Sequence, residues 1–374
     1  MIFFDHAAAA GVRQELAEQY PELVRRYSGN PEAAHQLGYQ LRQEMQELEN
    51  RLFGAVLPAG SKAEHRCFFG HDATEFINCV GLLTGDAKGC VWGSSLDHAA
   101  AAEMQKRCFG EIGLFALDHA GMITGLPSGN TPKLVYISAV QSEIGVRQDV
   151  PQLIREVRKA APEAIILLDA VQSAPFYDYP KDAPLPDLLL ISGSKFGAPS
   201  GAALLASGRH CRFFSEGFTR LRQQEYRIGK ADPLTAAMLT LAAEMNQKTR
   251  QESLQKVTQI NQFLRRELAN FILPNGKMPR LTVPQEKSAA NILHFTLPGY
   301  QAGVLVRMFS ARNIMLSSGS ACESESRAPS RILTALKYSR SDAFSGLRLS
   351  FGAENTLEEA QIFLHELKAV LADY

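Results

Sequence analysis

Short, unbroken apolar segments alternate with amphipathic helical segments through the first 206 residues of this chain. Segment 188–191 is typical, because four consecutive apolar residues run straight into serine, glycine and lysine. Strands of this kind are buried on both faces, as in a parallel sheet covered by helices. The alternation therefore predicts an α/β fold with a mainly parallel sheet sandwiched by helices. The expected strands are 66–69, 90–92, 133–138, 164–168, 188–191 and 201–206, and the expected helices are 12–26, 35–53, 76–83 and 150–161.

The pattern changes after residue 226, where a smaller α+β unit is predicted. Its expected elements are helices at 233–248, 252–271 and 357–371 and strands at 291–296 and 346–351, with a further strand at 2–5. A chain of 374 residues is long enough for two domains. We place the boundary near residue 250. Residues 12–250 then form a large α/β domain, and residues 1–11 join residues 251–374 in the small one.

Composition argues against several classes of protein. The 39 basic and 39 acidic side chains give a formal net charge of +0, unlike a dedicated nucleic-acid binder. No apolar run approaches the roughly 18 residues of a membrane-spanning helix, and the first residues lack the features of a signal peptide. The six cysteines include no CxxC pair, so neither a disulfide framework nor a metal site is expected. We expect a cytoplasmic protein that binds neither membranes nor nucleic acid.

Two residues at strand ends carry the first indication of chemistry. Lys195 is either a surface lysine or a Schiff-base nucleophile, because burial frees the amine of a lysine. Asp169 is either the N-cap of a turn or the carboxylate that keeps a pyridinium nitrogen protonated. Ligands bind beyond the carboxyl ends of parallel strands, and these two strands are consecutive in sequence. The pair therefore favours a pyridoxal phosphate site.

Further polar groups fit the same site, although each alone has an ordinary structural explanation. His98 could stack on a cofactor ring or act as a helix cap. Thr74, Ser192 and Ser194 could bind a phosphate through hydroxyls and nearby N–H groups, or cap helices. Gln172 could contact the phenolic oxygen of the cofactor, or lie exposed.

The second half of the chain adds an arginine and a cysteine. Alternation in segment 346–351 places Arg348 and Ser350 on the face opposite to the apolar residues. The Arg348 guanidinium could bind a substrate carboxylate bidentately, or form a surface ion pair. Cys322 lies among small residues at 317–324, which predicts a mobile loop with a nucleophilic thiol, or a cysteine of no consequence.

Taken together, these segments resemble the cysteine desulfurases of the class V aminotransferase family, along essentially the whole chain. The most specific part is the Ser-Ser-Gly-Ser-Ala-Cys run that ends at Cys322, with Arg348 downstream. The other matching segments are Phe4-Asp5-His6-Ala7-Ala8, Asn30-Pro31 with His35 and Gly38, Ala73-Thr74-Glu75, Asp97-His98, Glu143-Ile144-Gly145-Val146 with Gln148, Asp169-Ala170-Val171-Gln172, and Ser192-Gly193 with Lys195.

The resemblance implies a fold-type I enzyme with a seven-stranded sheet, a pyridoxal 5'-phosphate cofactor and a homodimer with the site near the interface. Lys195 would carry the cofactor as a Schiff base and move protons. Asp169 would pair with the pyridine nitrogen, His98 would stack on the ring, and Gln172 would contact the phenolic oxygen. The phosphate would lie against Ala73, Thr74, Ser192 and Ser194.

The resemblance also implies the reaction. Arg348 would hold the carboxylate of L-cysteine, and Cys322 would take its sulfur as a persulfide with release of L-alanine. A sulfur-acceptor protein, as in iron–sulfur cluster assembly, would then receive the sulfur.

Several positions depart from the family pattern. Ser194 replaces the histidine before the lysine, and Ser142 replaces the asparagine before Glu-Ile-Gly. We expect Ser142 to contact the cofactor and the adjacent Gln141 to contact the substrate. Asp72 places a carboxylate near the expected phosphate, and Lys230 replaces a hydroxyl that the partner subunit contributes in the family, so that its charge would offset Asp72.

Two alternative functions stay open. The pocket could process another amino acid, such as selenocysteine, cysteine sulfinate or a transamination substrate. A diverged paralogue could instead bind the cofactor or a sulfur-relay partner without efficient turnover, which the changes at Asp72, Ser142 and Ser194 favour.

Overall fold

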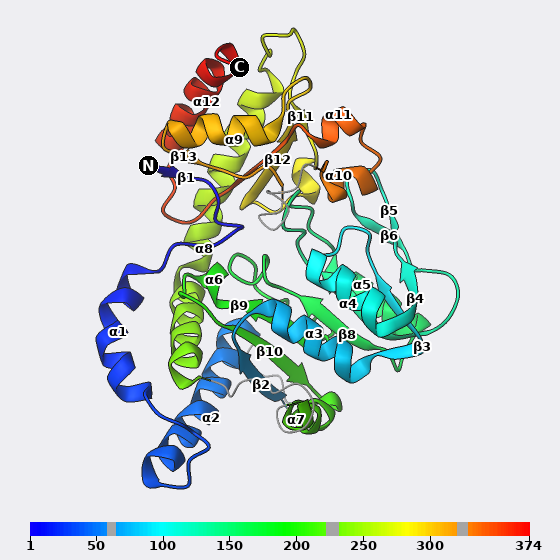
Figure 1. Cartoon of the computed structure of the whole chain (residues 1–374), viewed down its shortest axis with the longest axis vertical. Coiled ribbons are helices and arrows are strands. Elements are labelled where there is room, and N and C mark those ends of the chain that lie inside the picture. The colour runs from blue at the N-terminus through cyan, green and yellow to red at the C-terminus, as the bar shows by residue number, and fades with distance from the viewer. Residues whose placement is uncertain (58–64, 222–231, 320–327) are drawn as a thin grey trace.

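A seven-stranded sheet forms the centre of the larger part of the molecule (Figure 1). The computed structural model describes residues 1–57, 65–221, 232–319 and 328–374. The strand order is β2-β10-β9-β8-β7-β3-β4. The strands are β2 (His65–Gly70), β3 (Asp86–Gly93), β4 (Phe109–Leu114), β7 (Pro132–Ser138), β8 (Ile165–Asp169), β9 (Leu188–Ser192) and β10 (Ala202–Ser207). Within the described residues only β10 runs antiparallel to its neighbours. The expected mainly parallel, seven-stranded sheet is confirmed.

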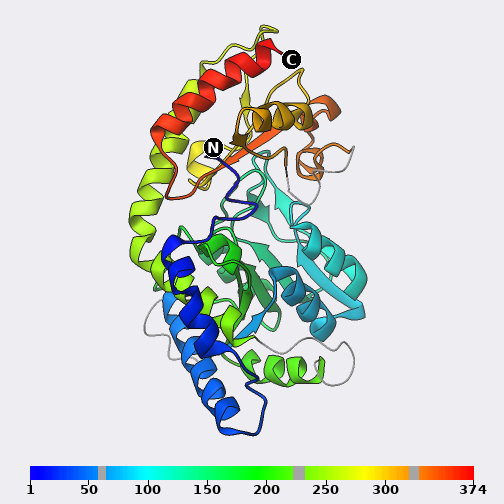
Figure 2. The same ribbon diagram turned by 60° about the vertical axis from the view of Figure 1, so that its left-hand side comes forward.

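Helices cover both faces of this sheet, because each strand is apolar on both sides. Leu167 packs in a cluster with helices α3 (Ala73–Thr84), α4 (Ala99–Cys108) and α7 (His210–Arg220). Its neighbour Leu168 points to the other face and packs in a second cluster. The helices of that cluster are α1 (Gln14–Tyr27), α2 (Gln36–Val56), α5 (Val150–Ala160) and the first half of α8 (Pro233–Ala269). Figure 2 shows α1 and α2 lying along the lower half of α8.

The two helices expected at 233–248 and 252–271 are one continuous helix, α8, so that this prediction was wrong. The side chain of Asp232 caps its first turn by accepting from Thr235 N. Polar residues interrupt the apolar pattern near residue 250, yet none is a helix breaker. Arg250 is buried there and donates to Ala55 O at 3.2 Å and to Asp178. The polar stretch is therefore the middle of the helix, where it passes from one core to the other.

The smaller part of the molecule surrounds the second half of α8. Its three-stranded antiparallel sheet has the order β11-β12-β14, and β1 pairs in parallel with β13. The elements are β1 (Ile2–Phe3), β11 (Arg280–Leu281), β12 (Ile292–Thr296), β13 (Ile314–Met315), β14 (Gly346–Ser350), and helices η2 (Gln285–Lys287), α9 (Ala302–Ala311), α10 (Arg331–Ala335), α11 (Arg340–Ala343) and α12 (Leu357–Ala372). Phe4 and Leu264 lie in one separate core with Phe351. The division near residue 250 remains an interpretation, which the separate cores support.

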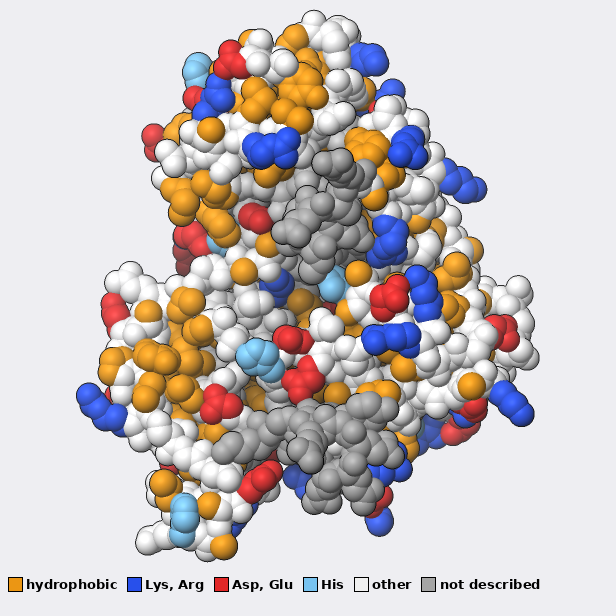
Figure 3. All heavy atoms as spheres, in the orientation of Figure 1, with side chains coloured by type: hydrophobic (Ala, Val, Ile, Leu, Met, Phe, Trp, Pro, Cys, Tyr) orange, Lys and Arg blue, Asp and Glu red, His pale blue; other side chains and the backbone are white. Residues whose placement is uncertain are grey.

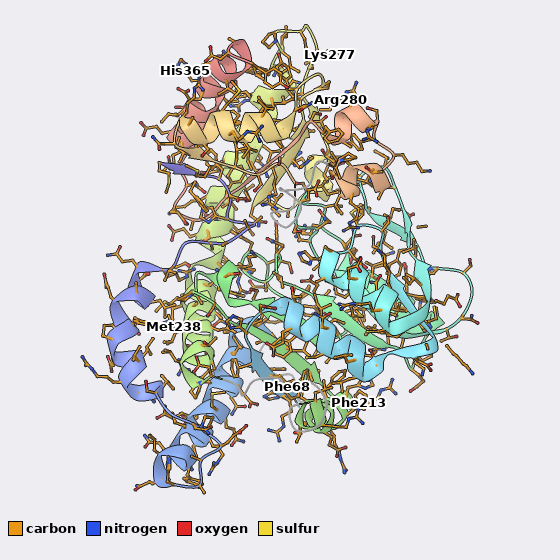
Figure 4. The ribbon with its side chains drawn as sticks, in the orientation of Figure 1. Phe68, Phe213, Met238, Lys277, Arg280 and His365 are labelled. Carbon is orange, nitrogen blue, oxygen red and sulfur yellow. The ribbon has the colours of Figure 1, made fainter. Side chains whose placement is uncertain are left out.

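Helix α7 packs on one face of the large sheet next to its edge strand β2. The Phe68 ring of β2 lies 4.6 Å from the Phe218 ring of α7. Figure 4 shows Phe68 and the more exposed Phe213 at this edge. A short hairpin of β5 (Ala116–Leu117) and β6 (Ile123–Gly125) lies beyond β4. In the ranges that the structure describes, no helix is both long and apolar enough to cross a membrane.

Candidate active site

A pocket of about 260 Å³ lies at the carboxyl ends of β8 and β9, where the sequence places its chemistry. Its wall includes Asp169, which ends β8, and Lys195, which follows β9. Every predicted site residue that the structure describes lines this one pocket. They are Ala73, Thr74, His98, Gln141, Ser142, Asp169, Gln172, Ser192, Ser194, Lys195 and Arg348. Cys322 and Lys230 lie outside the described residues.

Lys195 lies on a short helix, α6 (Gly193–Phe196), where the sequence predicted a loop. The helix ends at Gly197, whose φ of 84° is left-handed. The Lys195 ammonium donates to the carbonyl of Ala8, and Ala10 N donates to Ser194 O at 2.8 Å. The N-terminal segment therefore crosses the lysine and forms one wall of the pocket. Lys195 is therefore not the simple surface lysine that was its alternative interpretation.

Asp169 is held by a hydrogen bond on each carboxylate oxygen. Val171 N donates to Oδ1 at 3.0 Å, and the hydroxyl of Tyr136 donates to Oδ2 at 2.5 Å. His98 caps α4, because its Nδ1 accepts from Ala100 N at 3.2 Å, and it also lines the pocket. The two interpretations of that histidine are thus compatible.

Gln172 is buried rather than exposed, so that one of its two interpretations was wrong. Its Nε2 donates to Ala7 O at 2.9 Å. This bond ties the turn after β8 to the N-terminal segment that also accepts from Lys195. A second cavity of about 380 Å³ shares Gln172 and Lys195 with the pocket and extends to Arg13 and Glu354.

The hydroxyl groups gather where helix α3 begins. Ala73 and Thr74 form its first turn, and the Oγ atoms of Ser192 and Ser194 lie 3.1 Å apart. Asp72 is the N-cap, with Oδ1 accepting from Glu75 N at 2.8 Å. Hydroxyls around the N-terminus of a 12-residue helix form a site suited to an anion. One N–H group of that turn, Glu75 N, already donates to the Asp72 carboxylate and is not free to bind an anion.

Arg348 is 1% exposed, which excludes the surface ion pair that was its alternative. Its Nη1 donates to Ser142 O at 2.9 Å, and its Nη2 donates to Asp5 Oδ1 at 2.7 Å. Among the described residues, its Nε has no hydrogen-bond partner. A buried guanidinium must be paired to stay charged. Asp5 supplies the charge, and Nε is a buried donor without a partner among the described residues.

The loop after β7 is held by its own side chains. Gln141 Oε1 accepts from Glu143 N at 2.7 Å and from Ile144 N at 2.8 Å. Gln141 Nε2 donates to Leu96 O at 3.4 Å. Its amide is therefore engaged with the backbone, and the expected contact of Gln141 with a substrate stays a prediction.

The sequence model of the family described as aminotransferase class-V matches residues 2–363. The chain belongs to the class V aminotransferase family. Among curated proteins, it is similar to the putative cysteine desulfurase IscS 1 of Bacillus subtilis, at 24% identity over 372 residues that cover 96% of each chain. Among solved structures, it resembles the NifS-like protein from Rickettsia africae, with a TM-score of 0.81, 21% identity and 99% coverage of each chain. It also resembles SspA in complex with cysteine, with a TM-score of 0.68, 20% identity, and coverage of 94% of this chain and 99% of that one. The family resemblance inferred from the sequence is confirmed.

This class V aminotransferase contains three buried or half-buried groups near the pocket to which the sequence assigned no role. They are Asp5, Tyr136 and Asp97. Asp97 is 1% exposed, and burial, with the charge of Asp169 as a smaller cause, raises its pKa to about 7. Tyr136 had a weak sequence signal, since its hydroxyl interrupts an otherwise apolar strand centre. Asp5 and Asp97 each stand before a histidine, which indicates nothing about their partners.

Proposed function

We propose that this class V aminotransferase is a cysteine desulfurase that uses pyridoxal 5'-phosphate to convert L-cysteine to L-alanine. The observation that carries the proposal is one pocket lined by an amine, a carboxylate and a guanidinium, from Lys195, Asp169 and Arg348. Relatives named cysteine desulfurase that match almost the whole chain support it, as does a fold shared with a protein solved in complex with cysteine.

The residues present fit the cofactor. Asp169 offers a carboxylate to a ring nitrogen, and His98 offers an imidazole to a ring face. Thr74, Ser192 and Ser194 offer hydroxyls beside the N-terminus of α3 to a phosphate. When bound, the cofactor supplies an electron sink for charge at the α-carbon of the substrate.

Three side chains of the protein would then have separate roles in the reaction. Lys195 would hold the cofactor and carry protons to and from the substrate. The guanidinium of Arg348, which lines the pocket, would donate to the substrate carboxylate. The Cys322 thiolate would bond to the substrate sulfur as the carbon–sulfur bond breaks and leaves its electron pair on carbon. A proton then replaces sulfur on that carbon, so that the products are alanine and a persulfide on Cys322.

We also infer a cytoplasmic homodimer in which Lys230 of the partner subunit would face the phosphate. Hydrophobic side chains gather over α1 and α8 on the face shown in Figure 3. Val12 and Tyr20 are about half exposed at this end of the chain, and large exposed apolar patches are typical of protein contacts. Among the described cysteines, Cys67, Cys90 and Cys108 are free thiols, as in proteins of a reducing compartment.

The test is an absorbance spectrum of the purified protein with pyridoxal 5'-phosphate, followed by L-cysteine and a reductant. We expect a visible band from the bound cofactor, then stoichiometric alanine and sulfide. Lys195→Ala should lose the band, and Cys322→Ala should keep the band but lose sulfide release. Cys108→Ala, a described cysteine on α4, is the matched control and should behave as the wild type. A cofactor-loaded protein that makes no alanine from cysteine would overturn the proposal.

One observation favours a second candidate, a cofactor-binding protein with little turnover. The Asp72 carboxylate caps the helix at which the phosphate would bind, and like charges repel there. Asp72→Gly should then raise the affinity for pyridoxal 5'-phosphate and the rate of alanine formation together.

Steady turnover of selenocysteine or cysteine sulfinate by Cys322→Ala would instead favour the third possibility, another amino-acid substrate.

A further inference from the structure

Tyr136 lies in the middle of strand β7 and is completely buried. Side chains alternate along a strand, so Tyr136 and Leu134 share one face of the sheet, and Leu167 shares it from β8. Asp169, two residues beyond Leu167, lies on that same face. A phenol buried among apolar side chains needs a hydrogen-bond partner, and the partner it finds is the Asp169 carboxylate at 2.5 Å.

The direction of this hydrogen bond is fixed by the surroundings of the phenol. Burial raises the pKa of Tyr136 well above its usual value, and the charges of Asp169 and Asp97 raise it further. The hydroxyl therefore keeps its proton and is always the donor. Hydrogen bonds to a carboxylate favour its charged form, and a charge-assisted bond of this length is among the stronger ones.

A second carboxylate makes this donor more important. Asp97 is also near Asp169, with its Oδ2 accepting from Ser94 N and from Gln105 Nε2, both at 2.8 Å. The charge of Asp169 disfavours the charged form of Asp97. The Tyr136 hydroxyl and Val171 N are the two donors that hold the Asp169 carboxylate beside this second acid.

We propose that Tyr136 is a positioning residue that holds the Asp169 carboxylate in one orientation at the pocket, so that the carboxylate meets the protonated ring nitrogen of the cofactor. The inference rests on the proposed function, because it assigns Asp169 to that ring nitrogen. Tyr136 touches neither substrate nor cofactor in this arrangement, and it acts through Asp169.

The test compares two ligands on the apoprotein: pyridoxal 5'-phosphate and its 1-deaza analogue, which has carbon in place of the ring nitrogen. Tyr136→Phe removes one oxygen and keeps the ring. We expect it to weaken binding of pyridoxal 5'-phosphate roughly tenfold, as for loss of a hydrogen bond to a charged group. Affinity for the deaza analogue should stay within about twofold, because that ligand has no proton for Asp169 to hold.

A spectroscopic readout separates positioning from simple packing. With a ¹⁵N-labelled ring, the nitrogen resonance in Tyr136→Phe should move toward the unprotonated position at fixed pH. Tyr179→Phe is the matched control, since Tyr179 is half-buried and its hydroxyl donates to Pro184 O at 2.5 Å, away from the pocket. It should change neither affinity nor resonance.

Three outcomes decide the matter. Equal loss of both ligands in Tyr136→Phe, or no loss of either, overturns the role of Tyr136 while the proposed function stands. A wild type that does not bind pyridoxal 5'-phosphate overturns the proposed function and this inference together. If Tyr136→Phe does not fold, Tyr136→Phe combined with Asp169→Asn leaves no unpaired charge, and its affinity must equal that of Asp169→Asn alone.

Discussion

Arg348 Nη2 donates a hydrogen bond to Asp5 Oδ1 at 2.7 Å, between residues 343 positions apart in the sequence. The same Asp5 oxygen accepts from Ser317 Oγ at 2.7 Å, and Ser317 forms an isolated antiparallel bridge with Arg348. One carboxylate oxygen therefore joins the N-terminal segment, strand β14 and the segment that precedes Cys322. The pairing fixes the guanidinium before any substrate arrives.

Asp5→Asn should destabilise the fold by about 2–4 kcal/mol, because it leaves the buried Arg348 guanidinium without a counter-charge. The free energy of unfolding from urea titration measures this. Glu244→Gln is the control, since it breaks the more exposed pair with Arg51 and should cost less than about 1 kcal/mol. Equal losses in the two variants would show that the Asp5–Arg348 pair contributes no more than a surface pair.

Arg348→Lys should raise KM for L-cysteine by about 10- to 100-fold, because an ammonium cannot replace a planar fork with donors to Ser142 O, Asp5 and the substrate. Cysteamine, which lacks the carboxylate, is the control substrate. Its rate should be nearly the same in the variant and the wild type. A parallel fall with both substrates would mean that Arg348 supports the fold and not the carboxylate.

Asp97→Asn should remove part of the pH dependence of stability. The folded protein holds a proton on Asp97 up to about pH 7, whereas the unfolded chain releases it near pH 4. Wild-type stability therefore falls as pH rises through this window. Asparagine keeps the acceptor for Ser94 N and Gln105 and carries no such proton. Between pH 4.5 and pH 7.5, the free energy of unfolding of the variant should rise by on the order of 3 kcal/mol relative to that of the wild type. If the urea midpoints of the variant and the wild type differed by the same amount at both pH values, the assignment of the raised pKa to Asp97 would be contradicted.

Gly197→Ala should disrupt the lysine-bearing helix. Gly197 has φ 84°, and an added Cβ would lie 2.8 Å from the Arg13 side chain and 3.0 Å from Gly11 O. Gly208→Ala is the control, because its φ of 65° is also left-handed but nothing lies within 4 Å of its Cβ. Both should lose about 1 kcal/mol from the backbone, and Gly197→Ala should lose a further 1–3 kcal/mol from overpacking. If the two variants lost similar amounts of stability, the N-terminal segment near Gly11 and Arg13 would have moved to make room for the added Cβ at little cost in free energy.

Much of the fold follows from local pattern. Four-residue apolar runs such as 188–191 fit a doubly covered parallel sheet, and their polar ends place Asp169 and Lys195 at one edge. Local pattern was misleading in helix α8, where buried polar residues such as Arg250 resemble a surface break between two helices. It also missed helix α6, because four residues are too few to show a helical period.

The sequence by itself determined the layered architecture, the family and a set of polar residues that line one pocket, because strand burial and short motifs are encoded within a few neighbouring positions. Only the tertiary structure decided which groups hold the charged side chains of that pocket. Asp5 for Arg348, and Tyr136 for Asp169, are separated from their partners by 343 and 33 residues. Partners so far apart in the sequence are set by the order of the strands in a sheet and by where the N-terminal segment packs. Local sequence periodicity encodes neither of these.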